Sequence, residues 1–211
     1  MKYNSQYIDC AYLDQILLER YFANTANGFF IECGANDGIT DSNCKLFEDN
    51  FDWKGLNLEP AVDLYNKLTI NRPNSININK ALSDLIGDRK FYYPLDCYNC
   101  GSLDNLTEFA VSVIGDLNIN KNRIQEYSVK TTTYCDLIKE YNIKKIDLFS
   151  LEVEGHEINV ISNMLQSNIL PRIICIEYGH CGFDNINSIL CGAGYKNTFR
   201  DSVNCVYCLN A

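Results

Sequence analysis

The stretch FFIECGANDGITDSN, from Phe29 to Asn43, begins as a short apolar run and then changes to glycine and small polar residues. The apolar run is typical of a buried strand, and the residues that follow the stretch again have helical spacing. An ordinary turn between a strand and a helix needs only one or two residues of this kind. In open α/β sheets, ligands bind where a strand ends and the chain turns into the next helix. We therefore interpret this stretch as a ligand-binding turn.

The rest of the chain repeats the alternation of strand and helix. Apolar runs predict strands in GLNLE, SININKALS, IDLFSLEVEG and RIICIEYG, and the tail over 195–209 predicts two more. Between them, apolar residues recur at helical spacing, as at 158, 161 and 165 in HEINVISNML. Strands that alternate with helices favour βαβ units in a mostly parallel sheet with helices on both faces.

Length and spacing also predict the domain organisation. A chain of 211 residues is most simply one domain, over residues 1–211. Apolar residues from about Tyr7 to Ala23 recur at helical spacing, which predicts an N-terminal helical segment within residues 1–25. The segments RKFYYP and YSVKTTT are interpreted as further extended pieces.

Charge and hydropathy argue against two classes of partner. The net charge of −9 and the scarcity of clustered Lys and Arg argue against nucleic-acid binding. No apolar run reaches the roughly 18 residues that a membrane span requires. The opening MKYNSQYIDC lacks the basic and apolar parts of a secretory signal. We therefore expect a cytoplasmic protein, whose oligomeric state the sequence does not indicate.

The chain contains 11 cysteines, which we expect to be reduced thiols in such a compartment. Two CxxC pairs, Cys97/Cys100 and Cys205/Cys208, raise the alternative of a four-cysteine zinc site. Cys205 and Cys208 lie in a predicted strand that points them to opposite faces. We therefore favour cysteines that fill the core.

Five predicted strands end in acidic or small polar residues, in ECGAND, LEP, ALSD, LEVEGHE and IEYGH. The carboxyl ends of parallel strands meet at one edge of a sheet, so we expect these segments to line one crevice. Loops are polar in any protein, which explains one or two such ends more easily than five.

The residue types in this crevice point to a ligand. The turn has neither the GxGxxG dinucleotide pattern nor the Gly-Lys-Ser/Thr ending of a P-loop. Glu32 would repel a pyrophosphate but could pair with an ammonium group, and Gly34 and Gly38 allow a ligand to approach the backbone. Glu59 ends the next strand, where a carboxylate can accept hydrogen bonds from a ribose. A nucleoside with a cationic amino-acid tail, such as S-adenosylmethionine, meets these requirements.

Four blocks of the chain carry a family resemblance. FIECGANDGITDSN, WKGLNLEP, NKALSD and IDLFSLEVEGHE resemble, in this order, the FkbM-type S-adenosylmethionine-dependent methyltransferases, over about Phe29 to Glu177. The resemblance implies a Rossmann-like methyltransferase fold, with a mostly parallel seven-stranded sheet and an antiparallel strand near the C-terminus. It also implies methyl transfer to a hydroxyl of a sugar, a glycan or a glycosylated small molecule. The alternatives are another acceptor, through N-methylation or at an RNA end, and a methyltransferase-like scaffold that binds without catalysis.

The resemblance also implies roles for individual residues. The methionine end of the cofactor is expected at the turn, at Glu32, Gly34, Ala35, Asn36, Asp37 and Gly38. Glu59 is expected to hold the ribose, and Ser83 and Asp84 are expected near the adenine. Ser42 and Asn43 match the family's SN pair, with either cofactor contact or helix capping as their role. The family commonly has Asp where this chain has Glu152.

A sugar hydroxyl becomes a good nucleophile only when a general base or a metal ion assists the loss of its proton. His156 and His180 follow the fourth and fifth strands and are candidate bases, together with Glu152 and Glu154. Alternatively, Glu152 and Glu177 could bind Mg²⁺ or Mn²⁺.

Residues 95–126 are turn-rich, and we interpret them as an insertion that forms the wall beside the acceptor. Four aromatic residues in or near it could stack on sugar rings, with core packing as the alternative role: Tyr92, Tyr93, Tyr98 and Phe109.

Overall fold

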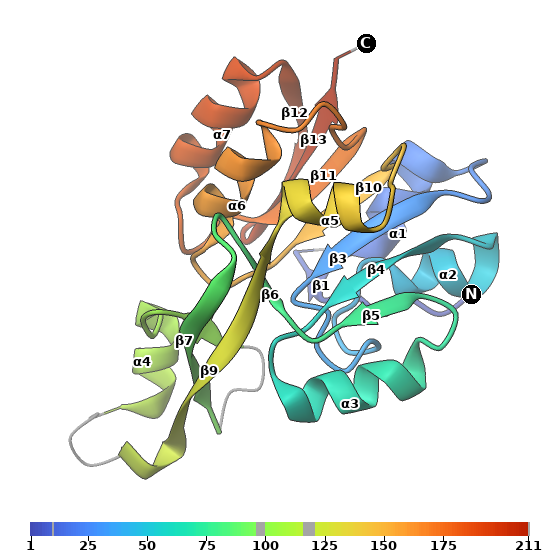
Figure 1. Ribbon diagram of the computed structural model, residues 1–211. Coiled ribbons are helices and arrows are strands. Elements are labelled where there is room, and N and C mark those ends of the chain that lie inside the picture. The colour runs from blue at the N-terminus through green and yellow to red at the C-terminus, as the bar shows by residue number, and fades with distance from the viewer. Residues whose placement is uncertain (10, 96–99, 116–120, 211) are drawn as a thin grey trace.

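The computed structural model describes residues 1–211 with the exception of residues 10, 96–99, 116–120 and 211. Its central feature is a mixed sheet of β3 (Phe29–Cys33), β4 (Lys54–Leu58), β5 (Ile76–Ile78), β10 (Leu148–Leu151), β11 (Ile173–Glu177), β12 (Tyr195–Arg200) and β13 (Asn204–Leu209). These seven strands have the order β12-β13-β11-β10-β3-β4-β5 (Figure 1). The strands from β11 to β5 are parallel, whereas β13 is antiparallel to both β11 and β12. The predicted fold class is therefore confirmed.

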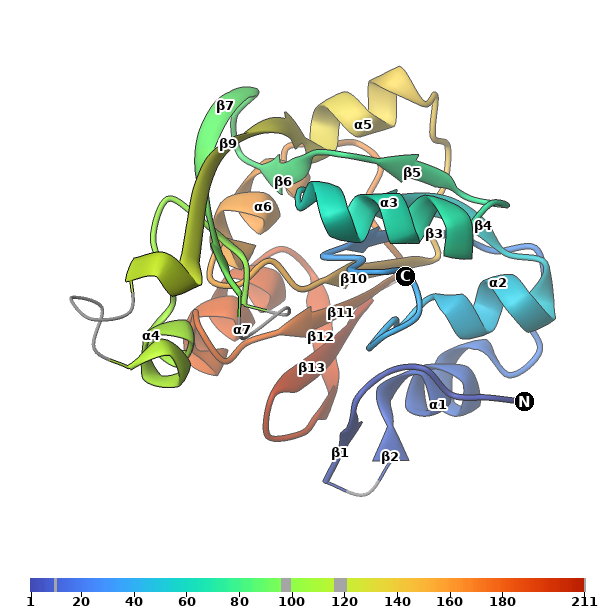
Figure 2. The same ribbon diagram turned by 90° about the horizontal axis from the view of Figure 1, so that it is seen from below.

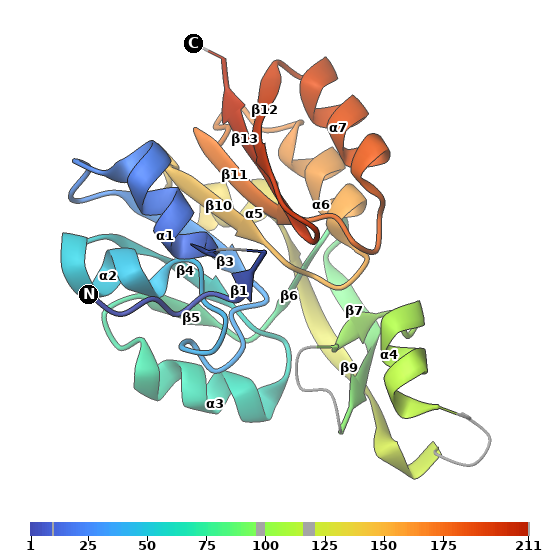
Figure 3. The ribbon, with the colours of Figure 1, turned by 180° about the vertical axis from the view of Figure 1, so that it is seen from behind.

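Helices cover both faces of this sheet because successive side chains of each buried strand point to opposite sides. On β3, Phe30 packs in one apolar cluster with residues of α1 (Leu13–Leu17) and α2 (Lys45–Phe51), which lie in front of the sheet in Figure 3. The neighbouring Ile31 packs in the other cluster, with α5 (Tyr134–Glu140), α6 (Glu157–Met164) and α7 (Phe183–Gly192). No helix among the described residues has both the length and the apolar character needed to cross a bilayer.

A second sheet lies beside the first. It contains β6 (Ala81–Ser83), β7 (Gly87–Pro94), β8 (Ser102–Leu103) and β9 (Ile124–Thr133), in the order β6-β9-β7-β8. The segments predicted as extended, RKFYYP and YSVKTTT, lie in β7 and β9. This sheet and α4 (Glu108–Ile114) project to one side of the main sheet (Figures 1 and 2). Its inner surface packs against the start of α3 (Val62–Asn71), where Leu64 meets Phe91 and Val129.

The predicted strand SININKALS is divided between the two sheets. Its first part is β5 in the main sheet, and its last part is β6, which pairs with β9. Between them, the Asn79 side chain donates hydrogen bonds to the backbone oxygens of Glu59 and Pro60, at 2.8 and 3.0 Å. These bonds attach the break to the end of β4, so the chain leaves the main sheet at this point.

The N-terminal segment differs from its prediction. A short hairpin of β1 (Tyr7–Ile8) and β2 (Ala11–Tyr12) precedes the helix, which begins only at Leu13 and continues as a π-helical turn, Leu18–Phe22. Buried Asp14 accepts hydrogen bonds from the Asn4 backbone N–H and the Ser5 hydroxyl, at 2.7 and 2.9 Å. The helix is therefore shorter than the spacing of apolar residues predicts, and the polar contacts of Asp14 connect the first residues of the chain to its start.

Four of the described cysteines are buried free thiols: Cys33, Cys44, Cys175 and Cys205. Cys205 lies in the cluster on the α5–α7 face, and Cys208 packs against the cluster on the opposite face. The two thiols therefore point to opposite sides of the sheet, as predicted. Cys97, of the other CxxC pair, lies outside the described residues. Cys100 is disulfide-bonded, which differs from the expectation that all the cysteines are free thiols.

Candidate functional site

A cavity of about 1280 Å³ opens at the carboxyl ends of the parallel strands. Its volume exceeds that of a typical pocket for one small ligand, roughly 300–1,000 Å³, so it can hold a cofactor and an acceptor together. Residues from all five predicted strand ends line it, among them Gly34, Glu59, Leu82, Glu154 and His180. The expectation that these five ends form one crevice is therefore confirmed.

The glycine turn forms one wall of the cavity through its backbone. Gly34 has a φ of +77°, and a Cβ atom at this position would lie 2.0 Å from the backbone oxygen of Glu152. Only glycine allows β3 and β10 to approach so closely at their ends. The N–H groups of Gly34 and Ala35 both donate to Leu58 O, at 3.1 and 3.0 Å, which fixes the turn against β4.

Glu59 lies at the end of β4 and faces the same cavity. It is only 5% exposed, and its two carboxylate oxygens accept hydrogen bonds from the backbone N–H groups of Asn36 and Ala61, at 2.9 and 2.8 Å. Burial raises the pKa of Glu59 to about 8, although both N–H donors favour the ionised form. Glu59 thus connects the glycine turn to the start of α3 and still borders the cavity.

Glu32 lies elsewhere than the sequence suggested. It is 3% exposed, and its carboxylate accepts hydrogen bonds from the Ser42 hydroxyl and the Cys44 backbone N–H. It also forms an ion pair at 3.0 Å with Arg72, which is fully buried and pairs with Glu48 at 2.8 Å. Glu32 is not among the cavity-lining residues. These contacts place the Glu32 carboxylate in the core behind the turn, and not in the cavity where the sequence predicted a contact with the cofactor amine.

Other residues of the turn also have structural contacts. Asp37 accepts hydrogen bonds from the N–H groups that follow it, and Gly38, at a φ of +82°, packs against Arg72. Ala35 is buried, and the Ser42 hydroxyl accepts a hydrogen bond from the Lys45 N–H at the start of α2, at 3.0 Å. Of the positions expected to hold the methionine end, Gly34 and Asn36 are the ones that line the cavity.

Asn43 also faces the cavity and is only 2% exposed. Its amide nitrogen donates to Ser150 Oγ at 3.0 Å and to Glu152 Oε1 at 2.6 Å, while its Oδ1 has no hydrogen-bond partner among the described residues. The two members of the SN pair therefore differ in their contacts: Ser42 accepts a hydrogen bond from the first N–H of α2, whereas Asn43 borders the cavity. Burial and the nearby Glu177 raise the pKa of Glu152.

Ser83 and Asp84 do not line this cavity, in contrast to the expectation that they lie near an adenine. Ser83 is fully buried, and its hydroxyl lies 3.0 Å from His156 Nε2. The preceding residues Ala81 and Leu82 line the cavity instead and provide an apolar surface there.

His156 borders the cavity, but its Nε2 is directed at a partly exposed polar cluster. Arg89 of β7 joins this cluster, donating to Ser83 Oγ at 3.1 Å and to Asp84 at 3.3 Å, and it also pairs with Asp104. Burial and the Arg89 guanidinium lower the pKa of His156. This environment favours a neutral, structurally bonded imidazole.

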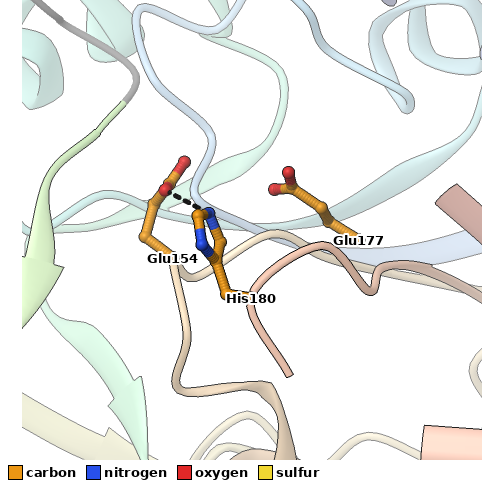
Figure 4. A group of neighbouring side chains, drawn as sticks. All are labelled: Glu154, Glu177 and His180. Carbon is orange, nitrogen blue, oxygen red and sulfur yellow. Dashed lines mark ion pairs between the residues drawn. The ribbon is translucent and has the colours of Figure 1, made fainter. Parts of the chain in front are cut away.

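His180 has a different environment, beside two carboxylates (Figure 4). Its Nε2 lies 2.9 Å from Glu154 Oε2, and Glu154, Glu177 and His180 place one ligand atom each within 4.8 Å of the others. The hydrogen bond to Glu154 raises the pKa of His180. Burial, with Glu154 close by, raises the pKa of Glu177 to about 7. The expected metal pair, Glu152 and Glu177, is thus replaced by a group in which Glu152 has no part.

The outer wall of the cavity comes largely from the second sheet and α4, in the region predicted as an insertion. Tyr93, Leu103, Asp104 and Thr107 line it. Of the aromatic residues proposed for this wall, Tyr92 is not among the cavity-lining residues, and Tyr98 and the side chain of Phe109 lie outside the described part of the chain. Sequence reasoning did not identify Arg89, although its place in the extended segment RKFYYP was a usable signal.

The solved structures most useful for comparison share the fold at low sequence identity. The methyltransferase FkbM from Methylobacillus flagellatus KT is 12% identical, with a TM-score of 0.51, over 86% of this chain and 43% of that chain. The METTL16 MTase domain is 13% identical (TM-score 0.51; 94% of this chain and 65% of that chain). The human methyltransferase 10 domain containing protein is 10% identical (TM-score 0.51; 94% and 81%). This chain therefore spans less than half of the FkbM structure that it resembles.

No curated protein matches the chain significantly. The model of the methyltransferase FkbM domain, however, matches residues 32–196, which include the glycine turn, Glu59 and the ends of β10 and β11. The match contains β4, β5, β10 and β11 entirely and includes all five strand ends at the cavity. On this evidence, the chain belongs to the FkbM methyltransferase family.

Proposed function

We propose that this chain transfers a methyl group from S-adenosyl-L-methionine to a hydroxyl of a sugar, a glycan or a glycosylated small molecule. The family and the fold support an S-adenosylmethionine-dependent methyltransferase. One observation carries the assignment of the two ends of the site. A single cavity has the glycine turn and Glu59 on one side and the Glu154–His180 pair on the other.

The residues on the first side fit the cofactor. Glu59 offers carboxylate oxygens to the ribose hydroxyls, and the apolar Ala81 and Leu82 suit an adenine face. The Oδ1 of Asn43, which has no partner among the described residues, is a hydrogen-bond acceptor for the ammonium group, and Glu152 beside it offers a second acceptor. This assignment gives Asn43 the contact that the sequence suggested for Glu32.

The residues on the other side suit the acceptor. S-adenosylmethionine supplies an electrophilic methyl group, so the protein must align the acceptor oxygen and remove its proton. The Glu154–His180 pair takes up this proton as the oxygen–carbon bond forms and the carbon–sulfur bond breaks. The products are a methyl ether and S-adenosylhomocysteine. Tyr93 on the outer wall offers an aromatic surface to a sugar ring.

The test is to incubate the protein with methyl-labelled cofactor and a panel of sugars, oligosaccharides, amino sugars and a short RNA, and to identify products by mass spectrometry. We expect a methyl ether on a sugar hydroxyl. His180→Gln should lower turnover about 10²–10⁴-fold while cofactor binding persists. Glu108→Gln, which removes another cavity-lining carboxylate, serves as the matched control.

Other outcomes would favour the alternatives. Label on an amine or on the RNA would contradict the proposed acceptor class. Heat of cofactor binding in a calorimeter, with no transfer to any acceptor in the panel, would instead favour a scaffold that binds without catalysis. Glu59→Ala should weaken cofactor binding far more than acceptor binding, and the reverse result would mean that the two ends of the cavity are assigned the wrong way round.

A further inference from the structure

We propose that Glu154, Glu177 and His180, together with Asn204, bind a divalent metal ion of the Mn²⁺ class. The three acidic and imidazole side chains come from two neighbouring loops and the end of β11, yet their ligand atoms lie within 4.8 Å of one another. Ligands about 2.1 Å from a common ion are separated by roughly 3–4 Å, so small side-chain shifts would complete the site. In Figure 4, the three side chains gather on the same side of the loops.

Asn204 provides a second, independent observation. It begins β13 directly opposite Glu177 of β11, and side chains of such cross-strand partners lie on the same face, about 5 Å apart. Asn204 lines the same cavity and is only 4% exposed. Its Oδ1 is buried without a hydrogen-bond partner among the described residues. A buried amide oxygen costs free energy when it has no partner, and a metal ion beside Glu177 would supply one.

The charges of this group of side chains also favour a bound cation. Glu154 and Glu177 bring two carboxylates to one imidazole. The nearby Glu157 is accounted for separately, because its oxygens accept hydrogen bonds from the backbone N–H groups of Val153 and Gly155, at 3.0 and 3.1 Å. Two partly buried carboxylates that share a single basic group repel one another, and a divalent cation would offset this repulsion.

The ligand types select the class of ion. The site offers oxygen atoms from Glu154, Glu177 and Asn204 and one imidazole nitrogen from His180. Mg²⁺ prefers oxygen ligands with near-ideal octahedral geometry, whereas a nitrogen ligand is better accepted by Mn²⁺ and its neighbours in the transition series. We therefore use Mn²⁺ as the probe and Mg²⁺ as the comparison.

A bound ion would deepen the proposed function, and this consequence rests on that function. An acceptor hydroxyl that binds the ion would lose its proton to water more easily, because a metal ion stabilises the alkoxide form. Glu154 and His180 would then act as ligands of the ion, in place of the role as base that they have without it. The ion would also hold the oxygen in place. Metal binding itself requires neither cofactor nor acceptor, so it can be tested even if the proposed methyl transfer fails.

The experiment titrates the metal-free full chain with MnCl₂ and measures free Mn²⁺ by electron paramagnetic resonance. We expect saturation at one ion per chain and tighter binding than for Mg²⁺. Electron spin-echo envelope modulation should detect a directly bound imidazole nitrogen. His180→Gln should abolish this signal and weaken binding at least tenfold, and Glu177→Gln should weaken it similarly.

Two further substitutions separate a built site from general acidity. Asn204→Leu should weaken Mn²⁺ binding, whereas Asn204→Asp, which keeps an oxygen ligand, should preserve or strengthen it. Glu108→Gln, in the same cavity but outside the group, should bind like the unchanged chain. If Mn²⁺ does not saturate below millimolar concentration, or if all these variants bind alike without a nitrogen signal, the proposal is overturned. Circular dichroism on each variant confirms that it remains folded.

Discussion

Glu32→Gln distinguishes between the two roles that Glu32 could have. If Glu32 supports the turn, the substitution removes a charge-assisted contact with buried Arg72 and leaves an amide in contact with its donors. Hydrogen bonds to charged groups contribute about 1.5–3 kcal/mol each. Arg72 keeps its second ion pair, with Glu48, so the loss should stay below the roughly 3–5 kcal/mol expected when a buried charge loses its partner altogether. We expect the free energy of unfolding to fall by about 2–3 kcal/mol.

The assay measures stability and cofactor affinity on the same variants. Urea denaturation gives the free energy of unfolding. Calorimetry with S-adenosylmethionine, without urea and well below the temperature of thermal unfolding, gives the Kd of the cofactor. Because Glu32 does not line the cavity, the Kd of the Glu32→Gln variant for S-adenosylmethionine should change less than about threefold. Glu48→Gln removes the other partner of Arg72 and should show the same pattern. Asn43→Leu, in contrast, should weaken cofactor binding by about tenfold, since it removes the acceptor that faces the cavity.

The opposite pattern would refute this reasoning. A carboxylate that binds the ammonium group directly would lose a charged hydrogen bond on substitution, which corresponds to about 10- to 100-fold in Kd. A Glu32→Gln variant with that loss of affinity and unchanged stability would restore Glu32 as a ligand of the cofactor. It would also mean that the ion pair with Arg72 opens when the cofactor binds.

Three further predictions test the site and its support. Gly34→Ala should destabilise the fold by more than about 3 kcal/mol, because it adds an overlap with the backbone of Glu152, directly after β10, to the cost of a positive φ. Gly194→Ala also has a positive φ but meets nothing within 4 Å, so it should cost only about 1–2 kcal/mol, and equal losses in urea denaturation would contradict the close approach. Glu59 has a folded-state pKa of about 8 against an ordinary value of 4.5, so between these values the folded chain holds a proton that the unfolded chain has lost. Stability should therefore fall as the pH rises through this window, by up to about 1.4 kcal/mol per pH unit relative to Glu59→Gln; parallel curves for the two proteins would show that Glu59 is ionised throughout. Trp53→Ala should cost about 3–5 kcal/mol in the same assay, because the indole is fully buried under the turn-bearing strand, and a loss below about 1 kcal/mol would contradict that packing.

The main sheet was predictable because its strands are short and buried on both faces. A run such as RIICIE has apolar residues on both sides, which is typical of a parallel strand between helices. The convergence of four strand ends followed from that assignment, whereas the fifth, ALSD, belongs to β6 of the second sheet and reaches the cavity from there. The second sheet was only partly predictable: the sequence indicated that β7 and β9 are extended, but their partners are distant. Ala81 of β6 pairs with Thr131, and no local pattern indicates such a pairing.

The roles of residues within the turn were less predictable than its position. Glu32 and Asn43 both lie in the stretch that the family resemblance marks, and both are polar residues at the edge of the sheet. What separates them is Arg72, which lies 40 residues beyond Glu32 in the sequence and meets it in the core. A contact of this range depends on how α3 returns to β3, which the sequence pattern does not specify. The N-terminal hairpin was not predicted for a similar reason, since buried Asp14 contacts Asn4 and Ser5, which lie before the segment with helical spacing.

Two groups of acidic side chains in this fold differ in the basic residue that they contact. Glu32 and Glu48 share the buried guanidinium of Arg72, and that group of contacts lies beneath the turn. At the cavity, Glu154 and Glu177 share the imidazole of His180, which can lose its charge. Buried carboxylates are stabilised when a cation compensates them, and we propose that a bound ligand supplies this cation to the second group. A methyl donor brings a sulfonium and a divalent ion brings two charges, and both would enter at the same strand ends. The two acids that share His180 therefore support our proposal for where this chain binds its ligands.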